Sequence, residues 1–313
     1  MARQELPLFA AAQSLVPATA SPLSVTEILR AAIGIPARNG KLMLRVILVI
    51  LFPFAFAVLL HYILAGPLMH KVEDDYENSS LDQKDVRALA GLELFFLVGF
   101  CILSFCGMLL TIYASASSYI GNHMGLNDLT LRIRLVWKNA LIAWLYVSFL
   151  TVVYIVSLFV LIKLVGLVST RDFTYVWSWM VAILGGTFYC YLAASWTLAL
   201  VISALEGDGL NALRKARKII RGRDLQGFCL MLILSVMSIP IYLFFYVTAA
   251  DDDDQLGPFP QFVFGSLATI LFCLAKFFFF VVFTVFYCDC KKSIGQRVEM
   301  ELGTGSELIQ LNP

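Results

Sequence analysis

Long apolar runs recur along most of the chain. A helix that crosses a hydrocarbon core of about 30 Å needs roughly 20 apolar residues. Six runs meet this length, at residues 42–66, 92–116, 140–167, 176–203, 227–249 and 262–287. None shows the period-two alternation of a barrel strand, so only helices can satisfy the backbone in lipid. The pattern therefore predicts an all-α membrane fold with six transmembrane helices.

The distribution of charge predicts which side each loop faces. The chain is 60% hydrophobic and 14% charged with a formal net charge of +1, which excludes an ordinary soluble domain and gives no reason to expect nucleic acid. Sixteen Lys and Arg residues fall in residues 1–41, 117–139, 204–226 and 288–313, against four in the alternate loops. Because positive loops stay cytosolic, both termini are expected in the cytosol. The membrane is expected to be that of the endoplasmic reticulum, another secretory-pathway compartment or the cell surface.

The ends of the chain lack long apolar runs. We expect disordered cytosolic tails at 1–23 and 293–313, around a membrane domain at 24–292. Ala18-Thr19-Ala20 resembles a signal-peptidase site, but Pro7 and Pro17 interrupt the pattern, and cleavage would reverse the basic loops. A plastid transit segment is the alternative for the first tail.

Three residues are candidates for covalent modification. Asn78 begins an Asn-Ser-Ser sequon on the predicted lumenal side, where glycosylation occurs, and chance occurrence is the alternative. Cys288 and Cys290 close the last run beside two lysines, a setting typical of palmitoylation. Since the other five cysteines lie inside the runs, no disulfide framework is predicted.

A short amphipathic helix is predicted ahead of the first span. Ser24 and Glu27 form a capping box pattern. The apolar residues that follow share one helical face, namely Val25, Ile28, Leu29, Ala32 and Ile33. We expect this elbow helix to end near Gly34 and Pro36 and to lie in the cytosolic interface.

The elbow pattern recurs before the third and fifth spans. Residues 125–129 read Gly-Leu-Asn-Asp-Leu and residues 209–213 read Gly-Leu-Asn-Ala-Leu, which match at four of five positions, 84 residues apart. We interpret the chain as three repeats, each an elbow helix followed by two spans. Internal repeats are common in transporters and also arise by duplication in structural proteins, so both classes stay open.

Three segments carry a resemblance to known proteins. The elbow at 24–41, the exit Ser-Ala-Leu-Glu-Gly at 203–207 and the following stretch at 213–227 resemble a plant family of six-span membrane proteins without established function. The same region is distantly similar to the membrane domain attached to some bacterial glycerophosphodiester phosphodiesterases. The resemblance covers about 24–292 and implies architecture and membrane residence.

Lys276 is a charged residue near the middle of the sixth span. An intramembrane charge is costly, and either end of the span is about 15 Å away, too far for comfortable snorkelling. No carboxylate is expected at its depth, so backbone carbonyls freed by Pro53 and Pro240 are the predicted partners. Lys276 is therefore a candidate to bind an anionic solute or lipid headgroup, and a carbonyl-bonded structural lysine is the alternative.

The segment before the fifth span is strongly basic. Its cations are Arg214, Lys215, Arg217, Lys218, Arg221 and Arg223. Anionic headgroups attract such segments by about 1 kcal/mol per basic side chain near the surface, so anionic lipids of the cytosolic leaflet are the predicted partners. Simple retention of positive charge in the cytosol explains the same residues.

Signatures of enzyme, metal and cofactor chemistry are missing from the sequence. The three histidines are scattered, and no nucleophile, phosphate-loop or metallohydrolase motif occurs. We expect His61, Glu93 and Lys163 to stay apart, and their convergence would favour a membrane enzyme. No metal and no cofactor are predicted.

Two functions remain. The first is a non-enzymatic scaffolding, lipid-organising or trafficking protein that contacts the cytosolic leaflet through basic elbows. The alternative is a transporter or channel for a small or amphiphilic anionic solute that uses Lys276. A cavity that reaches Lys276 would favour the second.

Overall fold

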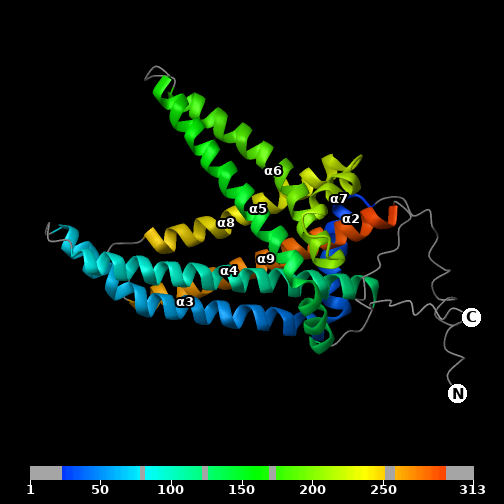
Figure 1. Ribbon diagram of the computed structural model, residues 1–313, viewed down its shortest axis with the longest axis horizontal. Coiled ribbons are helices and arrows are strands. Elements are labelled where there is room, and N and C mark those ends of the chain that lie inside the picture. Colours follow the sequence, from blue (N-terminus) through cyan, green and yellow to red (C-terminus); the bar gives the residue numbers. More distant parts are fainter. Residues whose placement is uncertain (1–22, 78–81, 122–125, 169–173, 251–257, 294–313) are drawn as a thin grey trace, which may run out of the picture.

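The protein is helical throughout the part that is described. The computed structural model describes residues 23–77, 82–121, 126–168, 174–250 and 258–293, and no strand occurs among them. The helices are α2 (Val25–Arg38), α3 (Gly40–Glu77), α4 (Gln83–Ile120), α5 (Leu126–Val168), α6 (Thr174–Glu206), α7 (Asn211–Ile220), α8 (Asp224–Ala250) and α9 (Pro258–Ser293) (Figure 1).

Six of these helices are long and apolar enough to cross a membrane: α3, α4, α5, α6, α8 and α9. The predicted fold class, an all-α membrane protein with six spans, is confirmed. Each of these helices extends beyond its predicted apolar run at both ends, because helical hydrogen bonds continue outside the lipid-embedded part. Asn78 and most of the two predicted tails lie outside the described residues, although Leu23 and Ser293 are described.

Two of the predicted elbows differ from expectation. α2 continues through Gly34 and Pro36 to Arg38, because Pro36 removes only one helical hydrogen bond while Ile35 beside it is buried. Ahead of the third span the described residues form no separate elbow, since α5 runs unbroken from Leu126. The three-fold repeat therefore stays a prediction.

The first elbow helix, α2, packs on protein. Ser24 and Glu27 form the predicted capping box. The buried face consists of Ile28, Ala32 and Ile35, whereas Ile33, predicted to share it, is 66% exposed. This face meets α3, α4 and α9. The apolar face of this elbow is therefore turned toward the protein, and its place in the cytosolic interface stays a prediction.

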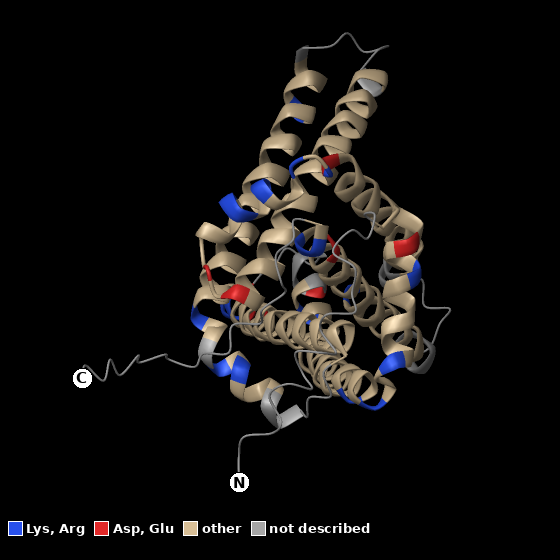
Figure 2. Ribbon diagram, turned by 90° about the vertical axis from the view of Figure 1, so that its right-hand side faces the viewer, with Lys and Arg blue, Asp and Glu red and all other residues tan. Residues whose placement is uncertain are grey.

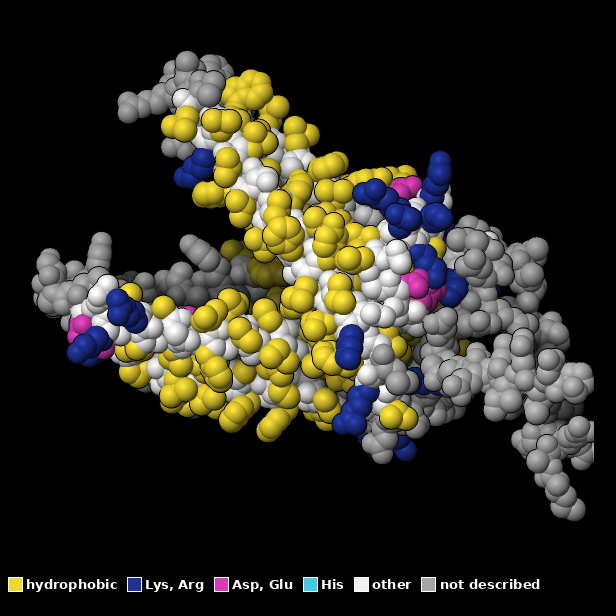
Figure 3. Space-filling model, viewed as in Figure 1, with side chains coloured by type: hydrophobic (Ala, Val, Ile, Leu, Met, Phe, Trp, Pro, Cys, Tyr) yellow, Lys and Arg dark blue, Asp and Glu magenta, His cyan; other side chains and the backbone are white. Residues whose placement is uncertain are grey.

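The helices converge at one end of the molecule (Figure 1). α3, α5 and α8 begin there and α4, α6 and α9 end there, beside α2 and α7. From this end the α3–α4 pair and the α5–α6 pair extend in different directions. Many Lys and Arg residues lie at the convergent end (Figure 2), and their side chains gather on its surface (Figure 3). We call it the basic end.

The buried core lies close to the basic end. Every side chain from 281 to 290 of α9 is buried, as is every side chain from 198 to 206 of α6. Along the two diverging pairs, apolar side chains instead cover the outer surface (Figure 3), with Phe52 76% and Phe149 64% exposed. Exposed apolar surface of this extent is what lipid tails solvate.

A close approach at Gly185 joins α5 to α6. The hydroxyl of Tyr154 donates a 2.7 Å hydrogen bond to the carbonyl oxygen of Gly185. A Cβ at Gly185 would overlap the Cδ1 atom of Leu158, whereas a Cβ at the adjacent Gly186 would meet nothing within 4 Å. Only at the first glycine would an added Cβ force a neighbouring side chain to move.

We therefore expect Gly185→Ile to lower the free energy of unfolding by about 1–3 kcal/mol through overpacking. Gly186→Ile changes helix propensity equally and its Cβ would meet nothing within 4 Å, so it should cost less than about 0.5 kcal/mol. Chemical unfolding of the detergent-purified protein measures both. Equal losses in the two variants would show that Gly185 has no special packing role.

Candidate functional site

Lys276 lies beside a cavity of about 430 Å³ between α5, α6, α8 and α9. Most of the wall is apolar or aromatic. Several hydroxyl groups also line it, from Thr151, Tyr189, Thr197, Ser235, Ser238 and Tyr242. An apolar cavity with a few convergent polar groups is the usual form of a small-molecule site.

The ammonium group of Lys276 lacks a counter-charge. Its Nζ lies 5.5 Å from the ring centroid of Phe272, and no hydrogen bond or ion pair to Lys276 is found among the described residues. Pro53 and Pro240 do lie inside α3 and α8, but the predicted bond to a backbone carbonyl is not formed. The side chain is exposed to the cavity and lies over the aromatic ring one turn earlier.

A second, smaller cavity borders the same lysine. It measures about 40 Å³ and lies between α3, α4 and α9, with Ser104 and Thr111 in its wall. Lys276, Phe272 and Phe280 line both cavities. A water molecule needs about 10–15 Å³, so this space is large enough to hydrate the ammonium group from the side away from the larger cavity.

A buried carboxylate, Glu206, joins three helices at the basic end. Its Oε1 accepts a 2.6 Å hydrogen bond from Nζ of Lys291 and another from the hydroxyl of Tyr287, both on α9. Its Oε2 pairs with Nζ of Lys215 on α7, which also bonds Asp208 at 2.8 Å. Burial alone would lower the pKa of Lys215, but the two carboxylates outweigh it and raise that pKa above its ordinary value.

The turn after Glu206 depends on glycine. Gly207 and Gly209 have φ of +70° and +52°, in the left-handed region that side chains disfavour. The Asn139 side chain of α5 donates a 2.6 Å hydrogen bond to the carbonyl of Gly207. The hydroxyl of Tyr113 on α4 donates at 2.7 Å to the carbonyl of Ala204. The exit segment that carries the family resemblance is therefore a junction of α4, α5, α6 and α7.

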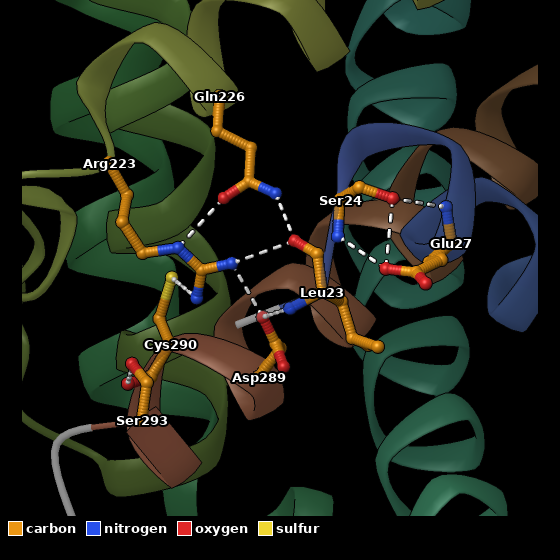
Figure 4. A network of polar contacts seen from close by, with 8 residues as sticks. All are labelled: Leu23, Ser24, Glu27, Arg223, Gln226, Asp289, Cys290 and Ser293. Atoms are coloured by element: carbon orange, nitrogen blue, oxygen red, sulfur yellow. Dashed lines mark hydrogen bonds and ion pairs between the residues drawn. The ribbon is translucent and has the colours of Figure 1, made fainter. Parts of the chain in front are cut away.

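Arg223 ties the start of the described chain to its last helix (Figure 4). Its Nη2 bonds Asp289 at 2.6 Å and the carbonyl oxygen of Leu23 at 3.3 Å, and its Nε donates to Gln226 at 2.7 Å. The Gln226 amide also reaches the Leu23 carbonyl, at 2.5 Å. We call these four residues the clasp.

The predicted palmitoylation of Cys288 and Cys290 does not fit the structure. Cys288 is 1% exposed and Cys290 0%. The Sγ of Cys290 also accepts a hydrogen bond from Arg223. Acylation requires an accessible thiol, and α9 stays helical to Ser293, which keeps both cysteines inside the bundle.

The six predicted lipid-binding cations divide into two groups. Lys215 is neutralised by two carboxylates, and Arg223, whose side chain is 14% exposed, belongs to the clasp. The other four are exposed and have no ion-pair partner among the described residues: Arg214, Arg217, Lys218 and Arg221. Lipid contact therefore stays a prediction, and the charge of Lys215 and Arg223 is already compensated within the protein.

His61 and Glu93 meet, contrary to expectation. Nε2 of His61 on α3 lies 3.0 Å from Oε1 of Glu93 on α4. Lys163 is on α5, with its Nζ 5.4 Å from the ring centroid of Phe159. The pair arises because α3 and α4 pack antiparallel along their length, so residues 32 positions apart face each other. In the described residues no group of three or more His, Cys, Asp or Glu side chains could hold a metal ion.

Glu206→Ala should lower the free energy of unfolding by about 3 kcal/mol or more, because Lys291 would stay buried without its counter-charge. Asp208→Asn removes a carboxylate from the same cluster. The Asp208 side chain is 36% exposed, however, and Lys215 would keep its ion pair with Glu206. That control should cost less than about 1 kcal/mol. Chemical unfolding in detergent measures the free energy of unfolding of both variants. Losses of the same size would contradict the conclusion that Glu206 is the carboxylate that holds α6, α7 and α9 together.

Arg223→Gln should release α2, since the clasp loses its charged bonds to Leu23 and Asp289. Hydrogen bonds to charged groups contribute about 1.5–3 kcal/mol, so amide exchange in α2 should accelerate by at least about tenfold. Arg221→Gln makes the same change two residues earlier at an exposed side chain and should leave exchange unaltered. Unchanged protection of α2 in Arg223→Gln would contradict the clasp.

Comparison with known proteins identifies the family. A family model described as Domain of unknown function (DUF8558) matches residues 19–302. Searches of curated proteins and of solved structures find no match. The resemblance to plant six-span proteins and to a phosphodiesterase membrane domain stays a prediction. The match includes all the described helices and the residues around Lys276, Glu206 and Arg223, and the chain therefore belongs to the DUF8558 family.

Proposed function

We propose that the protein binds a small or amphiphilic anionic solute in the cavity beside Lys276 and carries it through the membrane, without enzymatic chemistry. The observation behind this proposal is a cavity of about 430 Å³ lined by a lysine that has no counter-charge among the described residues. A cation at this depth is costly, and a bound anion would offset that cost. The alternative function named from the sequence is thus preferred to the scaffold.

The chemistry of the wall supports an amphiphilic ligand. Leu234, Phe272 and Phe279 supply apolar surface, and the hydroxyls of Tyr189 and Tyr242 can donate hydrogen bonds. An anionic head near Lys276 with an apolar chain against these rings would match this arrangement. A fully hydrated inorganic ion would make no contact with most of the apolar wall.

A scaffolding role rests on different residues. The exposed basic side chains of α7 support contact with anionic headgroups, and with the basic end in the cytosol they would face the inner leaflet. In this proposal the protein resides in the endoplasmic reticulum, another secretory-pathway membrane or the plasma membrane. Such contact is compatible with transport, but it gives no reason for a cavity at Lys276.

Oleate, an anionic amphiphile, should stabilise the detergent-purified protein, and uncharged oleyl alcohol should not. A ligand at 100 times its Kd adds about 2.7 kcal/mol, which thermal unfolding resolves. Lys276→Met should abolish the oleate effect. Lys163→Met removes a lysine that lies near an aromatic ring in a different span, and this variant should retain the oleate effect. Equal stabilisation of wild type and Lys276→Met by oleate would refute the proposed site.

A further inference from the structure

A third cavity, of about 580 Å³, lies at the basic end between α5, α6 and α7. Tyr146 and Leu150 of α5 and Leu192 of α6 form part of its wall. Arg214 and Arg217, both on α7, line it as well. This cavity is separate from the one at Lys276 and has a different composition, since two cations border it.

The two arginines present uncompensated charge on one side of α7. They are three residues apart, about one helical turn, so their side chains lie on the same face. Both are exposed and have no ion-pair partner among the described residues, although Lys215 between them is bound to Glu206 and Asp208. Two neighbouring guanidinium groups suit a phosphate, which they can bind with several parallel hydrogen bonds.

The rest of the wall suits the part of a lipid just below its headgroup. Leu150, Leu192 and Leu213 offer apolar contact, while Tyr146 and Trp196 are amphipathic rings of the kind found at membrane interfaces. Trp196 makes an edge contact with Tyr189, with ring centroids 6.3 Å apart. A soluble phosphate compound would use the arginines and leave these residues without a ligand.

We infer that this cavity is a binding site for a phospholipid with an anionic headgroup, whose phosphate is held by Arg214 and Arg217 and whose glycerol and upper acyl chains lie against Leu150, Leu192 and Trp196. The inference does not depend on the function proposed for Lys276. The two sites are nevertheless adjacent, because Trp196 lines both cavities.

Native mass spectrometry of the full chain in neutral detergent tests this site, with dioleoyl phosphatidic acid as the probe. Arg214→Gln/Arg217→Gln should weaken binding of the probe at least tenfold. The matched control, Lys218→Gln/Arg221→Gln, removes the same charge from exposed residues that do not line the cavity. This control should change the affinity for the probe less than threefold. Equal weakening in both double variants would mean that only net charge attracts the lipid and would overturn the site.

Two further arms separate the possible ligands. Leu192→Trp keeps both arginines but fills the apolar part of the cavity, and it should weaken phosphatidic acid binding as strongly as the double arginine variant. Unaltered binding in Leu192→Trp would overturn the assignment of lipid.

Glycerol 3-phosphate, which lacks acyl chains, should fail to displace the lipid. Displacement at comparable concentration would identify a site for free phosphate compounds instead. Lys276→Met should bind phosphatidic acid as wild type does, so failure of one site is distinguishable from failure of the other.

Discussion

The buried carboxylate of Glu206 is the interaction on which the rest of the structure depends. It accepts hydrogen bonds from Lys291 and Tyr287 at the end of α9. Because Gly207 permits a left-handed turn, α7 folds back at once and Lys215 reaches the same carboxylate. A buried charge is costly unless it is paired and hydrogen-bonded, so these helix ends cannot separate without leaving charge uncompensated. One acidic residue thus fixes α6, α7 and α9 at a single point.

Closure at the basic end leaves the opposite ends free to diverge. Away from Glu206, three polar contacts join helices of the same pair: His61 to Glu93 and Lys71 to Asp85 between α3 and α4, and Tyr154 to the Gly185 carbonyl between α5 and α6. Lipid tails are as apolar as the helix surfaces, so no hydrophobic force draws the pairs together along their length. Space therefore remains between α5, α6, α8 and α9, where Lys276 is found.

Sequence patterns predicted the parts of the fold that are encoded locally. The six spans, the capping box at Ser24 and the lysine within the last span follow from runs of neighbouring residues. The contacts of Glu206 with Lys291 and of Arg223 with Asp289 join residues 85 and 66 positions apart, and nothing in a single sequence pairs them. The basic segment at 206–226 could be recognised as basic, but which cations pair internally depends on packing. Trp196 lines two cavities, but in the sequence it is one residue of an apolar run and nothing there predicts this position.

The charge available to a ligand is what remains after internal pairing. Glu206, Asp208 and Asp289 neutralise Lys215 and Arg223, so two of the six cations near α7 serve the fold. Arg214 and Arg217 line a cavity and have no carboxylate partner among the residues that the structure describes, and the same holds for Lys276 in the span. Since the positive-inside rule counts all cations alike, it predicts orientation but cannot separate these groups. An anion that binds this protein should therefore meet the unpaired cations beside cavities, where its charge compensates theirs and its apolar part finds a surface.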